Sequence, residues 1–487
     1  MMIRCFLVLS LLISEINAQK PLDPLVVLGD ELEQKMWVDS IYSSMTIKEK
    51  VGQLFVVQAF SNKNKNHKVD IINEIKNNNI GGIIFSKGSP HKQVDLTNDF
   101  QNESTVPLLI GMDAEWGLNM RLDSTFSFPW NMTLGAIKDN KLIKQVGRSI
   151  AEHCKRIGVN FNFAPVVDIN TNPKNPIIGN RSFGESTKNV SLKSLSFMYG
   201  QQEMNILSSA KHFPGHGDTS TDSHKTLPFI NHDKERIFNT ELKPFKTLIN
   251  NGLESVMIAH LEVPSLESVN GLPSTLSYSI VTSLLKNTLG FKGLIITDAL
   301  EMKGLSTFKS NGNLDMLAFK AGNDVLLMSA NVSEGIKSII DEYDKGRISE
   351  ERLSYSVKKI LKAKYKVGLN NFIQISKNNL YNDLNSLENK LLYEELVEKS
   401  ITVVKNNDNI LPIINLNSKI GYLNFGNDKY MTFFDAITKY SKIDHLNNLD
   451  ILKSESASFI ESNYKTIIIG IHANSETPWK SYNLKKL

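Results

Sequence analysis

The sequence has only two cysteines, Cys5 and Cys154, which cannot make a disulfide framework or a thiolate zinc site. Cys5 lies in a segment that we expect to be removed, so we expect Cys154 to be a lone thiol that fills space in the interior. A large excess of one charge is also lacking, because 55 Lys and Arg nearly balance 51 Asp and Glu. The net charge of +4 supplies little free energy for binding a nucleic-acid backbone, so no nucleic-acid partner is expected.

Long hydrophobic runs are missing as well, since no apolar stretch approaches the about 20 residues that a membrane-spanning helix requires. At the N-terminus, the basic Arg4 precedes a short apolar run over residues 5–13, and Ala18 is a small residue that signal peptidase accepts. We therefore expect residues 1–18 to be a signal peptide and the exported chain to be periplasmic or extracellular, without a membrane span. A short membrane anchor is the alternative, because Ile16 fits the cleavage site imperfectly.

The composition, with 41% hydrophobic and 22% charged residues, excludes collagen, coiled coils and wholesale disorder. From about residue 50 to residue 330, short runs rich in Val, Ile and Phe alternate with longer stretches of helical periodicity. The eight runs span residues 51–57, 80–85, 108–113, 161–168, 208–213, 255–260, 294–298 and 324–328. Eight apolar strands separated by helices predict an α/β fold, a TIM-type (β/α)8 barrel over residues 19–369, with a doubly wound open sheet as the alternative.

Several of the apolar runs end in a side chain that can carry chemistry: Asp113, Asp168, His212, His260 and Asp298. In a barrel of this type the C-terminal ends of the strands build the active site. One such residue alone would be no more than an N-cap of the next helix, which is the alternative for Asp168. Five of them together predict a polar site at one end of the barrel.

Beyond the eighth run, residues 349–368 predict a closing helix with Ser349 as its N-cap and Gly368 as its terminator. Residues 370–385, rich in Asn, Lys and Ser, are expected to be a linker. A helix from Ser386 to about residue 400 should follow, and then strands at residues 401–404, 420–423 and 466–471. Residues 386–487 therefore predict the start of a second α/β domain that is small or incomplete.

The densest polar stretch runs from Lys211 to His224. His212 and His216 have the i, i+4 spacing of two metal ligands on a helix, and a metal-dependent hydrolase using them with Asp218 is one interpretation. Pro214 breaks such a helix, which favours a strand that ends at Lys211 and His212 and then a loop. We therefore expect neither a metal nor a cofactor.

That loop carries Asp222 and His224, two residues apart. The Asp222 carboxylate could hold the imidazole in one tautomer and raise its pKa, as a general acid requires, although solvated loop residues are the alternative. Asp298, at the end of its apolar run, is placed to be a carboxylate nucleophile or a base, with an N-cap as the alternative. Glu115 is the next candidate proton donor after His224.

Three stretches together carry a family resemblance. The residues from Lys211 to His224, K-H-F-P-G-H-G-x-x-x-x-D-S-H, closely resemble the signature of the β-N-acetylhexosaminidase branch of glycoside hydrolase family 3. Residues 296–298 resemble that family's nucleophile strand, and the R-S-F-G at residues 181–184 resembles its substrate-binding motif. The resemblance covers most of residues 35–370, and residues 398–412 resemble the opening of the family's C-terminal α/β sandwich domain.

The resemblance implies that Asp298 is the nucleophile, His224 the acid/base and Asp222 its orienting partner. It also implies a set of residues that bind the sugar at the nonreducing end: Asp113, Arg121, Arg181, Lys211 and His212. One position departs from the family pattern, because Trp116 stands where the family commonly has glycine. The tryptophan would supply either a stacking face or space filling.

The activity implied is that of a retaining β-N-acetylhexosaminidase, which removes terminal N-acetylglucosamine from cell-wall fragments or related oligosaccharides through a glycosyl-aspartate. The expected partner is thus a carbohydrate, while the oligomeric state is left open. A β-glucosidase-like or phosphorolytic enzyme of the same family and a non-catalytic sugar-binding barrel are the alternatives.

Overall fold

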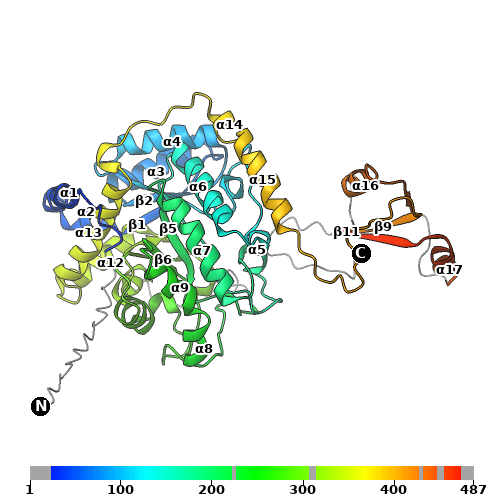
Figure 1. Cartoon of the computed structure of the whole chain (residues 1–487). Coiled ribbons are helices and arrows are strands. Elements are labelled where there is room, and N and C mark those ends of the chain that lie inside the picture. Colours follow the sequence, from blue (N-terminus) through cyan, green and yellow to red (C-terminus); the bar gives the residue numbers. More distant parts are fainter. Residues whose placement is uncertain (1–22, 222–225, 306–313, 427–430, 447–453, 473–487) are drawn as a thin grey trace, which may run out of the picture.

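The computed structural model describes residues 23–221, 226–305, 314–426, 431–446 and 454–472 (Figure 1). Within them, eight parallel strands form one sheet in the order β7-β6-β5-β4-β3-β2-β1-β8. They are β1 (Phe55–Phe60), β2 (Gly82–Lys87), β3 (Leu109–Met112), β4 (Phe161–Asn162), β5 (Leu207–Phe213), β6 (Ser255–Ile258), β7 (Leu294–Thr297) and β8 (Leu326–Leu327). An isolated bridge between Ile296 and Val325 brings the two ends of the sheet together. The predicted (β/α)8 barrel is therefore confirmed.

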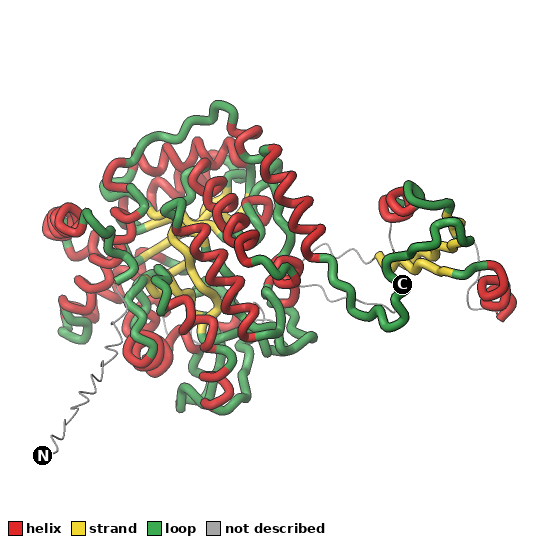
Figure 2. The backbone as a smooth tube through the Cα atoms, viewed as in Figure 1, coloured by secondary structure: helices red, strands yellow, loops and turns green. Residues whose placement is uncertain are grey.

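Helices cover the outside of this sheet (Figure 2). Those of the barrel are α1 (Glu31–Ser44), α2 (Ile47–Gly52), α3 (Lys65–Asn78), α4 (Pro90–Glu103), α5 (Asn131–Ala136), α6 (Asn140–Arg156), α7 (Thr187–Gln202), α8 (Lys234–Asn239), α9 (Leu242–Ile249), the π-helix η4 (Ser279–Thr288), α11 (Leu314–Ala321), α12 (Val332–Asp344) and α13 (Glu350–Lys366). Since strands covered in this way meet no water on either face, their sequences are almost continuously apolar. Cys154 on α6 is fully buried, as expected.

Two strands differ from the sequence prediction. The first run was expected to begin at Val51, but Val51 and Gly52 end helix α2, which a capping box between Thr46 and Glu49 starts. A Cβ on Gly52 would lie 1.9 Å from the carbonyl oxygen of Asn78, so only glycine fits there. The fourth run forms only the two-residue β4, because Pro165 has no N–H for a sheet hydrogen bond.

The closing helix is confirmed as α13, where the Ser349 side chain accepts a hydrogen bond from the backbone N–H of Arg352. This helix meets the fully buried Asp324, which precedes β8. Lys359 Nζ lies 2.5 Å from Asp324 Oδ2, and Ser356 Oγ donates to Oδ1 at 2.5 Å. Burial would raise the pKa of Asp324, but the charges of Lys359, Lys286 and Arg352 outweigh it and lower that pKa.

We expect Asp324→Asn to lower the free energy of unfolding by about 3–5 kcal/mol, because it leaves the buried Lys359 without its counter-charge. Urea unfolding at neutral pH measures this loss. The matched control is Asp39→Asn, which breaks exposed pairs with Lys35 and Lys358 and should cost less than about 1 kcal/mol. Because the pKa of Asp324 is lowered on folding, its stabilisation is present above about pH 4 and is lost on acidification. Equal losses for both variants would contradict the prediction.

The segment expected to be a linker packs on the barrel. Arg156 Nε donates to Asp383 Oδ2 at 2.7 Å, and the backbone of Ile375 exchanges hydrogen bonds with the Asn98 side chain on α4. Short helices η6 (Leu369–Asn371) and α14 (Leu380–Asp383) lie in it. Helix α15 (Leu387–Ser400) follows with Ser386 as its N-cap, as predicted. It is anchored to the barrel by Asn389, whose Nδ2 lies 2.8 Å from Nε2 of His153 on α6.

The last described part of the chain contains a three-stranded parallel sheet in the order β10-β9-β11. Its elements are β9 (Ile420–Gly426), α16 (Thr432–Ile437), β10 (Ile443–His445), α17 (Ser454–Asn463) and β11 (Thr466–His472). The strands predicted from residues 420 and 466 are confirmed. The strand predicted at residues 401–404 is wrong, since this stretch pairs with none of the strands that the structure describes and leaves Val404 92% exposed. The domain boundaries at residues 18, 369 and 385 stay predictions.

None of the helices in the described ranges combines the length and the apolar character needed to cross a membrane.

Candidate active site

A cavity of about 480 Å³ lies at the C-terminal ends of the barrel strands. Its wall contains six of the predicted site residues: Asp113, Arg121, Arg181, Lys211, His212 and Asp298. They come from loops and strands far apart in the sequence, so the barrel is what brings them together. Asp222 and His224 lie outside the described residues, and their predicted roles stay predictions.

Asp298 follows directly after β7 and faces this cavity. Its Oδ1 accepts a hydrogen bond of 2.8 Å from the backbone N–H of Ala299. Burial would raise the pKa of Asp298, but the electrostatic effects of the neighbouring His260, His212 and Lys211, together with the hydrogen bond from the Ala299 N–H, outweigh burial and lower it. The side chain is therefore an anionic carboxylate at neutral pH, which is the form that can act as a nucleophile.

Asp113 is held between two cations. Lys211 Nζ lies 2.7 Å from Asp113 Oδ1, and Arg121 donates to Oδ2 at 2.5 Å. The charges of Lys211 and Arg121 overcome the effect of burial and lower the pKa of Asp113. The carboxylate thus stays anionic beside two donors, an arrangement that can hydrogen-bond several hydroxyl groups of a sugar.

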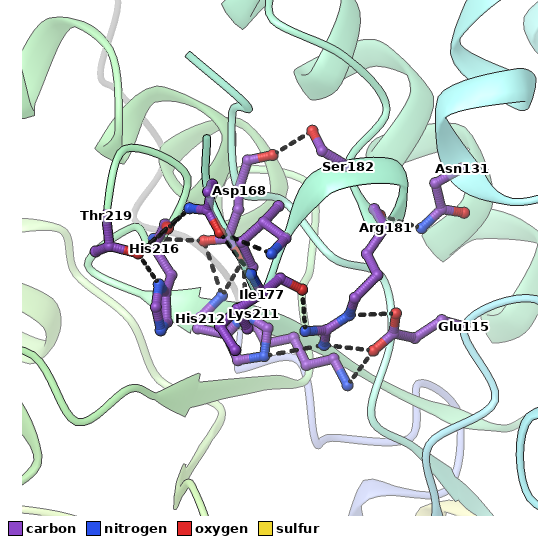
Figure 3. Close-up of polar contacts among 12 residues, drawn as sticks. Glu115, Asn131, Asp168, Ile177, Arg181, Ser182, Lys211, His212, His216 and Thr219 are labelled. Carbon is purple, nitrogen blue, oxygen red and sulfur yellow. Dashed lines mark hydrogen bonds and ion pairs between the residues drawn. The ribbon is translucent and has the colours of Figure 1, made fainter. Parts of the chain in front are cut away.

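Glu115 completes this charge network, although the sequence prediction did not place it among the sugar-binding residues. Arg181 donates two hydrogen bonds to the Glu115 carboxylate, from Nη2 to Oε1 at 2.7 Å and from Nε to Oε2 at 3.0 Å (Figure 3). Lys211 Nζ lies 2.8 Å from Oε1. Burial would raise the pKa of Glu115, but Arg181 and Lys211 lower it to about 2. Its position two residues after Asp113 was the one signal in the sequence. The lowered pKa argues against Glu115 as the proton donor.

Asp168 orients His212 and does not cap a helix. Its Oδ2 lies 2.7 Å from His212 Nδ1, and Oδ1 accepts the backbone N–H of His216 at 2.6 Å (Figure 3). A carboxylate partner places a proton on Nδ1. His212 Nε2 is then directed at Arg181, whose Nη2 lies 3.3 Å away. The N-cap alternative for Asp168 is therefore wrong, and the residue supports a sugar-binding side chain.

His260 lies two residues after the end of β6, and its side chain contacts the backbone of the next strand's loop. Its Nε2 lies 2.9 Å from the carbonyl oxygen of Ala299, and its Nδ1 lies 2.6 Å from Thr275 Oγ1. Because Ala299 follows Asp298, this contact fixes the backbone next to the expected nucleophile.

The interpretation of His212, His216 and Asp218 as metal ligands gains no support. His212 Nδ1 binds Asp168, His216 Nδ1 binds Thr219, and Asp218 pairs with His232. Within the described ranges, no three His, Cys, Asp or Glu side chains are grouped so as to hold a metal ion.

Trp116 fills space behind the cavity. It is 8% exposed and packs against Trp130, with ring centroids 6.4 Å apart. It is absent from the wall of the cavity, so it offers no stacking face there.

The chain is similar over most of its length to proteins of known family. Residues 46–363 match the family model for the glycosyl hydrolase family 3 N terminal domain. β-Hexosaminidase A of Pseudoalteromonas piscicida is 32% identical over 394 residues, which cover 74% of this chain and 65% of that protein. β-Hexosaminidase of Actinobacillus pleuropneumoniae serotype 3 is 32% identical over 285 residues, or 56% of this chain and 81% of that protein.

Among solved structures, a glycoside hydrolase family 3 β-N-acetylglucosaminidase from Paenibacillus sp. str. FPU-7 superposes with a TM-score of 0.71. It is 29% identical, and the match covers 88% of this chain and 84% of that one. The chain therefore belongs to glycosyl hydrolase family 3, so the family predicted from sequence is confirmed.

Proposed function

We propose that this chain is a retaining β-N-acetylhexosaminidase that hydrolyses terminal N-acetylglucosamine from cell-wall fragments or related oligosaccharides. The observation that carries the proposal is the anionic Asp298 on the wall of a cavity that also holds the Asp113, Lys211 and Arg121 cluster. The names of the two β-hexosaminidases and of the β-N-acetylglucosaminidase support the choice of substrate.

In this mechanism, a carboxylate oxygen of Asp298 attacks the anomeric carbon while the bond to the leaving oxygen breaks. His224 gives its proton to that oxygen and later takes a proton from the water that attacks the glycosyl-aspartate. The sugar is released with its original anomeric configuration, and Asp298 is regenerated. Asp113 and Glu115 are both held anionic, so a neutral-pH proton donor is needed from elsewhere, which favours the loop with Asp222 and His224.

Activity on an aryl N-acetylglucosaminide and on the matching aryl glucoside tests the substrate. The proposed function requires clear preference for the N-acetylglucosaminide and a first-formed product of retained configuration by NMR. Preference for the glucoside would overturn it, and formation of a sugar phosphate in phosphate buffer would show phosphorolysis in place of hydrolysis.

We also propose that the chain is exported, on the basis of Arg4, the apolar residues 5–13 and Ala18. Protein isolated from cells that produce it naturally should begin at or near Gln19 and fractionate outside the cytoplasm. N-terminal sequencing and fractionation measure both properties. Recovery of Met1 or Met2 at the N-terminus would contradict export.

A further inference from the structure

His216 is a buried histidine in the wall of the cavity that the proposed mechanism does not use. It is 1% exposed and lines the cavity together with His212 and Asp298. Its ring meets the His212 ring edge to face, with centroids 5.9 Å apart. His216 therefore stands directly beside a residue expected to bind the sugar.

Three contacts hold the Nδ1 atom and the backbone of His216 in place (Figure 3). Its Nδ1 lies 2.7 Å from Thr219 Oγ1, and its backbone N–H donates to Asp168 at 2.6 Å. Its carbonyl oxygen accepts a hydrogen bond of 2.8 Å from the side chain of Asn175. These contacts fix the direction in which the ring points.

The other ring nitrogen, Nε2, is buried and has no hydrogen-bond partner among the described residues. Burial, together with the electrostatic effect of the neighbouring His212, lowers the pKa of His216 to about 4, so the ring is neutral at pH 7. A neutral imidazole always has one N–H and one bare nitrogen. Nε2 is therefore an unsatisfied donor or acceptor, and such a buried atom costs free energy until a partner reaches it.

We infer that Nε2 of His216 forms a hydrogen bond with a hydroxyl group of the sugar bound in this cavity. The inference rests on the proposed function, because it takes an N-acetylglucosamine unit as the occupant. A hydroxyl suits Nε2 in either tautomer, since it can both donate and accept. The acetamide N–H can only donate and the acetamide oxygen can only accept, so each of them suits one tautomer alone.

Two substitutions separate this contact from the structural role of His216. In His216→Asn, the side-chain amide lies where Nδ1 was, so it can keep the contact with Thr219 while Nε2 is lost. In His216→Gln, the longer side chain places an amide close to the former Nε2. We expect His216→Asn to lower kcat/KM for an aryl N-acetylglucosaminide about tenfold, as for one lost neutral hydrogen bond, and His216→Gln to restore part of it.

The same enzymes are then assayed on analogues of the substrate that each lack one hydroxyl group, with thermal unfolding as the check on folding. For one analogue, wild type and His216→Asn should have the same kcat/KM within about twofold, because the partner hydroxyl is already absent. If His216→Asn does not fold, the comparison is made with His216→Gln, whose residual loss should disappear for that one analogue.

Three results would overturn the inference: no loss in either variant, an equal loss on every analogue, or a loss that disappears only when the acetamide is replaced by hydroxyl. An equal loss would mean that His216 only shapes the cavity wall. A wild type without activity on the aryl N-acetylglucosaminide would instead overturn the proposed function and the sugar assignment with it.

Discussion

Changing Asp298 to Asn should lower kcat by several orders of magnitude while the protein remains folded. The amide has nearly the shape of the carboxylate, so it can fill the same place after β7 and keep the contact with the N–H of Ala299. It lacks the negative charge that attacks the anomeric carbon and that stabilises the oxocarbenium-like transition state. Turnover of an aryl N-acetylglucosaminide and thermal unfolding are the two measurements.

The matched control is Asp99→Asn, the same chemical change at an exposed carboxylate that pairs with Lys68 on the outside of the barrel. It should leave both activity and stability close to wild type. A mechanism-based fluorosugar should label Asp298 in the wild-type protein and no other carboxylate. Near-normal turnover of Asp298→Asn, or a label on another residue, would remove Asp298 from the nucleophile's role.

The barrel could be predicted because its strands are buried on both faces, which makes each one a short apolar run in the sequence. The polar residues at the ends of those runs predicted the cavity for the same reason. A charged side chain that follows a buried strand is excluded from the apolar core and therefore lies at the end of the barrel. Where the prediction failed, local chemistry outweighed the apolar pattern. Thr46 and Glu49 cap a helix over part of the first run, and residues 401–404 pair with no strand among the described residues.

The partners of the site residues could not be read from the sequence, because they depend on contacts between distant loops. From the sequence, Glu115 was a candidate proton donor. The structure shows that Arg181 and Lys211 both pair with its carboxylate, which keeps it anionic. For Asp168 the sequence left a helix N-cap open as the alternative, because the histidine that it orients lies 44 residues further along the chain. Such contacts between residues far apart in the sequence decide whether a carboxyl group acts as an acid, acts as a nucleophile or orients another side chain.

If His224 protonates the leaving oxygen, His224→Ala should impair the enzyme most on substrates with a poor leaving group, such as a sugar alkoxide. An acidic phenol can depart without a proton, so the first step should be nearly spared for an activated aryl glycoside. Removal of the glycosyl group by water still needs a base, and the glycosyl-enzyme should therefore accumulate. Asp222→Asn should show a weaker form of both effects, because it removes the orienting carboxylate and leaves the imidazole.

The measurement is kcat/KM for both substrate classes in wild type and the two variants, with Glu115→Gln as the comparison. Glu115 is paired with Arg181 and Lys211, and its pKa of about 2 keeps it anionic. We expect Glu115→Gln to lower activity on good and poor leaving groups alike, because it disturbs the charges around Asp113 and supplies no proton in the wild type. Equal losses in His224→Ala would mean that His224 only binds the sugar or shapes its loop. A loss in Glu115→Gln that grows as the leaving group becomes poorer would move the acid role to Glu115.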